Sequence, residues 1–199
     1  PAAEANLLNY LWPLLIVVFA ALLPGQRLKA HHLAGALLGL AGTALLIVSR
    51  GGLGGGFAAG HLIGYAAAVG CALFWAVYSV TARLLPHAPT EAVAGFCLAT
   101  AALALLCHLA VETTVWPADA LQWLAIIGMG LGPVGAAFYL WDVGMKRGDI
   151  QVLGAASYAA PVLSTLALVA FGYAQPSLVL AAAVALIVTG SLVAARDML

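Results

Sequence analysis

Charged residues are scarce in this chain of 199 residues: seven are basic and seven are acidic, so the net charge is zero. The chain has no basic patch, which excludes nucleic acid as a partner, and its composition excludes a disordered chain or a coiled coil. A soluble domain is about 25% charged, whereas this chain is 7% charged and 65% hydrophobic, with a mean hydropathy of +1.10. Too little polar surface remains to coat a globule in water, so the sequence predicts a membrane protein.

Motifs of enzymes and ATP-driven pumps are also missing. The sequence has no Gly-x-Ser-x-Gly elbow, no His-Glu-x-x-His and no phosphate-binding loop. Its lysines are Lys29 and Lys146, and neither lies deep in the last hydrophobic segment, which excludes a rhodopsin-like retinal site. The three cysteines and five histidines show no metal-ligand spacing. We therefore expect no enzymatic activity, no cofactor and no metal site.

Long hydrophobic segments fill the rest of the chain. Each is rich in Ala, Leu, Val and Gly and is close to the roughly 20 residues that a helix needs to cross a bilayer. Helices are expected because backbone groups in lipid must be hydrogen-bonded within their own segment. The sequence thus predicts an all-α polytopic membrane protein with seven transmembrane helices, at 5–23, 31–49, 61–83, 90–111, 120–145, 150–173 and 177–195.

The basic residues fix an orientation. Six of the seven fall on one side of the predicted spans, and Arg50 falls on the other. Because positive loops stay in the cytoplasm, the C-terminus is expected to be cytoplasmic and Pro1 external. A chain that starts outside, on a proline, and without a signal peptide suggests that an odd number of spans precedes it.

An internal repeat appears at an offset of 148 residues. Tyr10 and Pro13 align with Tyr158 and Pro161, and the predicted spans that carry them run in opposite directions. Inverted repeats are typical of secondary transporters, whose substrate site lies near the midplane between the repeats. If the second copy has five spans, so should the first, which predicts ten helices of which three are absent here.

Three runs now carry a family resemblance: EANLLNYLWP at 4–13, LFWAVY at 73–78 and ASYAAPVLS at 156–164. They resemble EamA-domain transporters of the drug/metabolite transporter superfamily, and specifically the YddG-type aromatic amino acid exporters. The resemblance implies the last two helices of a first EamA repeat at 1–50, a linker at 51–60 and a complete second repeat at 61–197. It also implies a monomeric inner-membrane exporter of aromatic and other apolar amino acids, with lipid and a small-molecule substrate as its partners.

Two other functions stay open. One is a multidrug or other small-metabolite carrier of the same superfamily. The other is a channel or scaffold that transports nothing. Saturable, substrate-competed flux would separate a carrier from the second group.

Aromatic and hydroxyl side chains within the spans are the candidates for substrate binding. Trp12 lies about eight residues into its span, near mid-depth rather than in an interfacial belt. Trp75 and Tyr78 share a helix face and could stack on an aromatic side chain, although core packing would explain them equally well. The full set of candidates is Tyr10, Trp12, Trp75, Tyr78, Ser157 and Tyr158.

Prolines and one acidic residue complete the predicted site. Pro13, Pro133 and Pro161 lie within spans and are expected to kink or break them, as alternating access requires. The carboxylate of Asp142 lies clearly inside a predicted span, which makes it a candidate proton site or a partner for the substrate amine. Lys146 lies four residues later, so a plain salt bridge is the alternative. Glu4, at the outer end of its span, is expected at the interface.

Small-residue stripes predict close helix packing. Gly35-x-x-x-Gly39 and Gly60-x-x-x-Gly64 both have the spacing that brings two helices into backbone contact.

Overall fold

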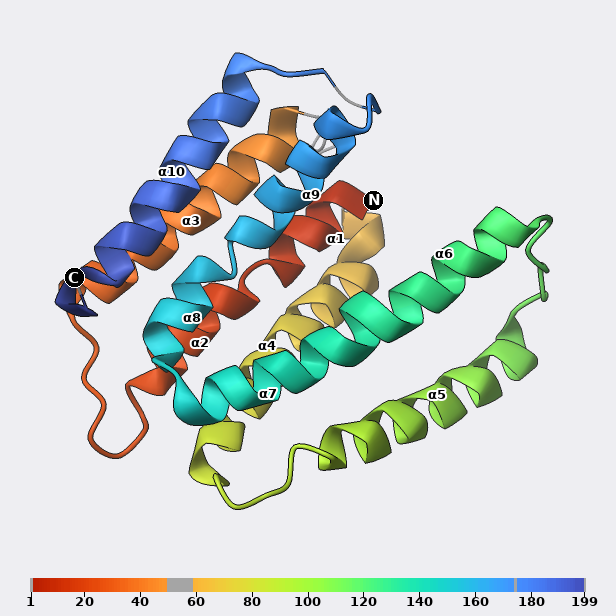
Figure 1. Cartoon of the computed structure of the whole chain (residues 1–199), viewed down its shortest axis with the longest axis horizontal. Helices are drawn as coiled ribbons and strands as arrows, with labels where there is room; N and C mark the ends of the chain where they lie inside the picture. The colour runs from red at the N-terminus through yellow and green to blue at the C-terminus, as the bar shows by residue number, and fades with distance from the viewer. Residues whose placement is uncertain (1, 50–58, 174, 199) are drawn as a thin grey trace. The chain divides into compact units, whose positions relative to one another are not determined.

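The computed structural model describes residues 2–49, 59–173 and 175–198, and within these residues the chain is all-helical with no strand. Figure 1 shows the helices in chain order from red to blue. They divide into two compact units, residues 1–84 with 149–199 and residues 85–148. Arg50 and residues 51–58 of the expected linker lie outside the described residues.

The first unit contains most of the helices. From the first part of the chain come α1 (Ala2–Asn9), α2 (Trp12–Ala20), α3 (Ala30–Ser49), the short η1 (Ala59–His61) and α4 (Leu62–Leu84). From the last part come α8 (Ile150–Ala156), α9 (Ala159–Ala170), α10 (Leu178–Ala194) and the short η3 (Arg196–Met198). Helices α1 and α2 pack on α4, α2 also packs on α8, and α3 packs along α10. Their shared core is apolar and includes Val17, Ala36, Tyr158, Val162 and Ile187.

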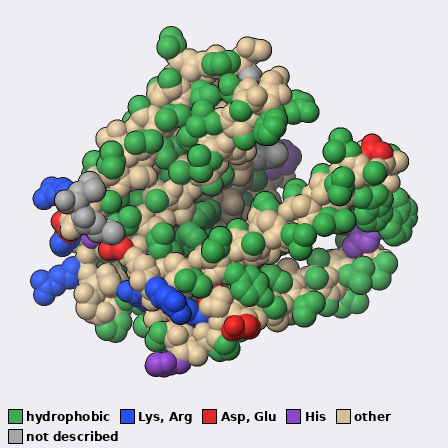
Figure 2. All heavy atoms as spheres, viewed as in Figure 1, with side chains coloured by type: hydrophobic (Ala, Val, Ile, Leu, Met, Phe, Trp, Pro, Cys, Tyr) green, Lys and Arg blue, Asp and Glu red, His purple; other side chains and the backbone are tan. Residues whose placement is uncertain are grey.

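The second unit consists of α5 (Ala92–Val111), α6 (Ala120–Leu131), a π-helical turn η2 (Gly132–Ala136) and α7 (Ala137–Arg147). Most of its apolar side chains are exposed, including Leu98, Leu109 and Leu124. Such a surface is stable in lipid and would be an aggregation hazard in water. Figure 2 shows hydrophobic side chains spread across the visible face, as expected for a chain that spans a membrane.

Five helical stretches are long and apolar enough to cross a bilayer, namely Ala30–Ser49, Leu62–Leu84, Ala92–Val111, Ala120–Arg147 and Ile150–Ala170. The all-α, multi-pass expectation is therefore confirmed. The two remaining expected spans correspond to shorter apolar stretches of 17 residues, Glu4–Ala20 and Leu178–Ala194. The count of seven spans stays a prediction.

Helices are interrupted next to prolines in three places. Helix α1 ends at Asn9, four residues before Pro13, and α8 ends at Ala156, five residues before Pro161. A proline has no N–H to donate to the carbonyl four residues earlier, and its ring clashes with that carbonyl, so the helix opens there. In both places the next helix begins three residues later, so each span becomes two segments joined by a single turn.

The third interruption is the π-helical turn around Pro133. A Cβ atom added to Gly135 would lie 2.6 Å from the carbonyl oxygen of Gly130, five residues earlier. Only glycine fits that close approach, so the turn depends on Gly135 as well as on the proline.

Helices α3 and α10 run antiparallel and touch backbone to backbone (Figure 1). A Cβ atom on Gly190 would lie 2.6 Å from the carbonyl oxygen of Gly35 and 3.0 Å from the amide nitrogen of Gly39. Farther along, a Cβ atom on Gly42 would lie 3.0 Å from the carbonyl oxygen of Ala183. The stripe at Gly35 and Gly39 thus packs as expected, whereas nothing among the described residues lies within 4 Å of a Cβ built on Gly60 or Gly64.

Candidate functional site

Three aromatic side chains from distant parts of the sequence form one cluster in the first unit. Trp12 begins α2, and Trp75 and Tyr78 lie one turn apart on α4. The ring centroids of Trp12 and Trp75 are 6.3 Å apart at an interplanar angle of 87°, and those of Trp75 and Tyr78 are 5.4 Å apart at 36°. All three side chains are half-buried. The cluster therefore presents aromatic surface that the described residues cover only in part.

The break between α1 and α2 positions this cluster. Pro13 opens the helix, and Trp12 follows directly on the turn formed by Tyr10 and Leu11. The packing of α1 and α2 on α4 then brings Trp12 to Trp75. Tyr10 is half-buried within the turn itself. In one continuous helix, two residues two positions apart point about 200° apart around the axis. Because α1 and α2 are separated by a turn, this angle does not fix the relative directions of Tyr10 and Trp12.

The second pair of candidates, Ser157 and Tyr158, occupies the corresponding turn between α8 and α9. The Ser157 hydroxyl donates to the carbonyl of Leu153 at 2.7 Å, a backbone contact that favours bending of the helix. Tyr158 is 0% exposed, and its ring lies against the backbone of α3 at Gly39, where a Cβ atom would overlap it. The structure thus encloses Tyr158 in the core rather than leaving it open to a ligand.

Asp142 lies in the second unit and is 4% exposed. Its Oδ2 accepts from the Lys146 ammonium at 2.6 Å and from the Thr90 hydroxyl at 2.8 Å. Lys146 also donates to the carbonyl of Ala88 at 2.9 Å. The charge of the Asp142 carboxylate is therefore balanced by Lys146. This is the salt bridge that the sequence predicts as the alternative to a proton or amine site. A cavity of about 560 Å³ beside it is lined by Lys146, Arg147 and residues 86–91, among others.

Glu4 lies in the first turn of α1, at the end of its apolar stretch, and is 2% exposed. Its expected place at the membrane interface stays a prediction, because burial of a side chain does not fix its depth in a bilayer. Its position near the end of a segment gave no signal of this burial.

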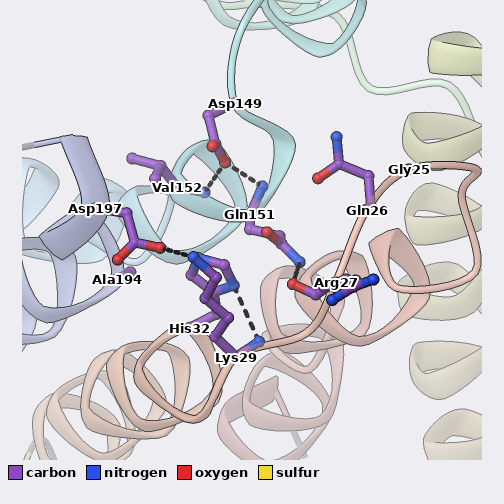
Figure 3. Close-up of a pocket in the computed structure, with 10 residues that line it drawn as sticks. All are labelled: Gly25, Gln26, Arg27, Lys29, His32, Asp149, Gln151, Val152, Ala194 and Asp197. Carbon is purple, nitrogen blue, oxygen red and sulfur yellow. Dashed lines mark hydrogen bonds and ion pairs between the residues drawn. The ribbon is translucent and has the colours of Figure 1, made fainter.

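A polar cavity of about 270 Å³ lies at one end of the first unit (Figure 3). Asp149 caps α8 by accepting from the backbone N–H groups of Gln151 and Val152, each at 3.0 Å, and the Gln151 side chain donates to the carbonyl of Arg27 at 3.3 Å. Lys29 pairs with Asp197, and this hydrogen bond lowers the pKa of the Asp197 carboxyl below its usual value. The cavity thus contains both signs of charge, from chain segments more than a hundred residues apart.

Comparison with known sequences decides the family. The sequence profile described as the EamA-like transporter family matches residues 62–196, which is more than half of the chain. The chain belongs to the EamA-like transporter family. Membership explains why five stretches can cross a membrane and confirms the family assigned from the three sequence runs.

Two relatives of this chain carry the same name. The chain is 60% identical over 194 residues to the "Aromatic amino acid exporter YddG" of Ancylobacter novellus, and the match covers 98% of this chain and 67% of that protein. It is 27% identical over 168 residues to the protein of the same name from Salmonella typhimurium, covering 82% of this chain and 57% of that protein. The chain therefore spans between about half and two thirds of the length of these relatives.

The EamA-like fold is also seen in a solved crystal structure that is 58% identical to the chain, with a TM-score of 0.92. The match covers 99% of this chain and 67% of that one.

Proposed function

We propose that this EamA-like protein is a secondary transporter that exports aromatic and other apolar amino acids across the bacterial inner membrane. The proposal rests on the curated relatives, which are named as aromatic amino acid exporters. One structural observation supports it most directly: the half-buried cluster of Trp12, Trp75 and Tyr78 beside a broken helix. Flat aromatic faces attract aromatic side chains by about 0.5–1.5 kcal/mol per pair beyond the burial of area.

The proposed architecture is a ten-helix carrier of two inverted five-helix repeats. Residues 1–50 would supply the last two helices of the first repeat, 51–60 the linker and 61–197 the second repeat. The profile match over 62–196 supports the second boundary. The proposed carrier has its C-terminus in the cytoplasm, acts as a monomer and uses no cofactor.

Two structural correspondences support the inverted repeat. The turn between α1 and α2 (residues 10–11) and the turn between α8 and α9 (residues 157–158) lie 147 residues apart, within one residue of the offset of 148 between the two Tyr-x-x-Pro motifs. The same offset carries residues 35 and 42 onto 183 and 190. The offset therefore relates two close backbone contacts, that of Gly35 with Gly190 and that of Ala183 with Gly42, and both are observed. Two antiparallel helices related by a two-fold axis make such paired contacts.

In the proposed mechanism the two repeats rock about the α3–α10 contact while the broken helices bend. The turns before Pro13 and Pro161 and the π-helical turn at Pro133 supply the bending points, since each lacks a regular hydrogen bond. Substrate side chains would pack on Trp12, Trp75 and Tyr78, with Tyr10 and Ser157 as polar neighbours. We assign Tyr158 to packing against α3 because it is fully buried.

Asp142 is proposed to act as an ion-pair partner of Lys146 rather than as a proton or amine site. Both of its neighbours bind the same oxygen, and Lys146 neutralises its charge. A free carboxylate in lipid would be costly, and this pairing removes the cost.

The test is transport in proteoliposomes by the protein expressed from its complete coding sequence. The variant Trp75→Ala removes the central ring of the cluster, and Trp123→Ala is the matched control because Trp123 is an exposed tryptophan of α6. We expect phenylalanine flux to fall in Trp75→Ala and to stay at the wild-type level in Trp123→Ala, at equal reconstitution. Wild-type flux in both variants would remove the cluster from the pathway. Flux of unrelated drugs but not of phenylalanine would favour the multidrug alternative, and unsaturable leakage would favour a channel.

A further inference from the structure

Two adjacent histidines and one aspartate meet at the end of the first unit. His31 and His32 lie in the first turn of α3, and Asp197 lies in η3, directly after α10. Because α3 and α10 are antiparallel, the start of one lies beside the end of the other. One ligand atom from each of the three residues lies within 4.8 Å of the other two. No spacing in the sequence indicates this group, since 165 residues separate His32 from Asp197.

The spacing of the ligand atoms is near the spacing that a bound ion requires. Zinc binds histidine nitrogen at about 2.0–2.1 Å and carboxylate oxygen at about 2.0–2.2 Å, so neighbouring ligand atoms lie about 3.3–3.5 Å apart. His31 Nε2 and Asp197 Oδ2 are already 3.3 Å apart. A displacement of little more than about 1 Å would bring the most distant pair into the same range.

One ring nitrogen of the group, His31 Nε2, is in a state suited to ligation. It is buried and has no hydrogen-bond partner among the described residues. At 3.3 Å from Asp197 it has the proximity of an ion pair without the geometry of a hydrogen bond. The side chain of His32 is buried, and its Nδ1 accepts from the backbone N–H of Lys29 at 3.4 Å, which orients the ring. Ligation through Nε2 requires the tautomer with the proton on Nδ1, so His32 would give up this contact with Lys29 when it binds a metal.

Space for further ligands is present. His32 and Asp197 line the polar cavity of about 270 Å³ described above, which is large enough for the waters that complete the coordination of an ion. Figure 3 shows Asp197, Lys29 and His32 close together at this cavity. The ammonium of Lys29 contacts Oδ2 of Asp197, the same oxygen that lies 3.3 Å from His31 Nε2.

We propose that His31, His32 and Asp197 bind one divalent transition metal ion of the zinc type, which joins the start of α3 to the segment after α10. Two imidazoles and one carboxylate suit zinc and its neighbours, whereas magnesium and calcium prefer sites made of oxygen ligands alone. The metal and the Lys29 ammonium compete for Asp197. The site therefore differs from the aromatic cluster and does not depend on what the protein transports.

The experiment is calorimetric titration of the purified full-length protein in detergent with zinc chloride, paired with thermal unfolding at each zinc concentration. We expect one ion per chain, a rise in Tm with zinc and no such rise with magnesium. His31→Ala and Asp197→Asn should each weaken binding more than about tenfold, since even the loss of an outer hydrogen bond costs 10–100-fold. His87→Ala, which removes an exposed histidine outside this group, should leave binding unchanged.

Lys29→Met separates a metal site from a plain ion pair. Removal of the competing ammonium should tighten zinc binding severalfold, although it also removes the pair with Asp197. Three results would each overturn the proposal. The first is the absence of saturable zinc binding. The others are wild-type binding in both His31→Ala and Asp197→Asn, and loss of binding in Lys29→Met. Unfolding without metal shows whether each variant is folded, and a misfolded variant is replaced by His32→Gln, for which we again expect weakened binding.

Discussion

The contact between α3 and α10 makes a sharp prediction for Gly190→Ala. The new Cβ atom would lie 2.6 Å from the carbonyl oxygen of Gly35, 3.0 Å from the amide nitrogen of Gly39 and 3.1 Å from Cβ of Leu38. Relaxed contacts lie near about 3.5 Å, so α10 would have to move roughly 0.5–0.9 Å away from α3. Two of these three neighbours are backbone atoms, which cannot swing aside. Overpacking of this kind costs about 1–3 kcal/mol.

Gly70→Ala in α4 is the matched control. A Cβ atom there has no neighbour within 4 Å among the described residues. Replacing glycine by alanine at such a helical position is expected to stabilise the fold by about 0.4–1 kcal/mol. Because Gly190→Ala has the same gain, the free energies of unfolding of the two variants should differ by the overpacking cost, roughly 1–3 kcal/mol.

The assay is equilibrium unfolding in detergent micelles, followed by circular dichroism and tryptophan fluorescence. Gly190→Ala should unfold at a lower denaturant concentration than wild type, and Gly70→Ala at the same or a higher one. If the two variants agree within about 0.5 kcal/mol, α3 and α10 do not pack backbone to backbone and the reasoning is refuted.

Further predictions concern the ion pair, the proline turn and the aromatic cluster. Asp142→Asn leaves the Lys146 ammonium without its charge partner and should lower the free energy of unfolding by about 3 kcal/mol. The double variant Asp142→Asn with Lys146→Met should recover most of that loss. If Asp142→Asn instead abolishes transport at wild-type stability, the carboxylate carries protons or binds the substrate amine. Pro161→Ala should let α8 continue into α9, which would show as slower amide exchange around Ser157 together with reduced flux, and unchanged exchange would mean that the turn has another cause. Tyr78→Phe keeps the ring at Trp75 and should preserve phenylalanine flux, whereas Tyr78→Ala should reduce it; equal flux in the two would show that ring stacking at this position is irrelevant.

The features that the sequence predicted well are local ones. The helical class, the breaks beside Pro13 and Pro161 and the close-packing role of Gly35 each follow from a few neighbouring residues and from the chemistry of backbone groups in lipid. Gly64 has the same four-residue spacing as the stripe at Gly35, yet the space beside it is open among the described residues. Spacing shows that a helix can be approached closely, but it does not show which helix approaches.

The features that the sequence did not predict depend on contacts between distant segments. Glu4 is buried although it lies in the first turn of its helix, and the ring of Tyr158 lies against α3, so neither burial can be read from neighbouring residues. The group of His31, His32 and Asp197 exists only because α3 and α10 are antiparallel and end at the same level. By contrast, Asp142 and Lys146 are four residues apart on one helix, and there the sequence could offer the salt bridge as one of its alternatives.

The central claim, that this EamA-like protein carries amino acids through a site lined by aromatic rings, is tested most directly by phenylalanine flux into proteoliposomes over a range of concentrations. The measurement uses radiolabelled phenylalanine, with tryptophan and glutamate as unlabelled competitors. We predict saturable flux that tryptophan competes for and glutamate does not. Flux that rises linearly with concentration, or that neither competitor changes, would contradict the account.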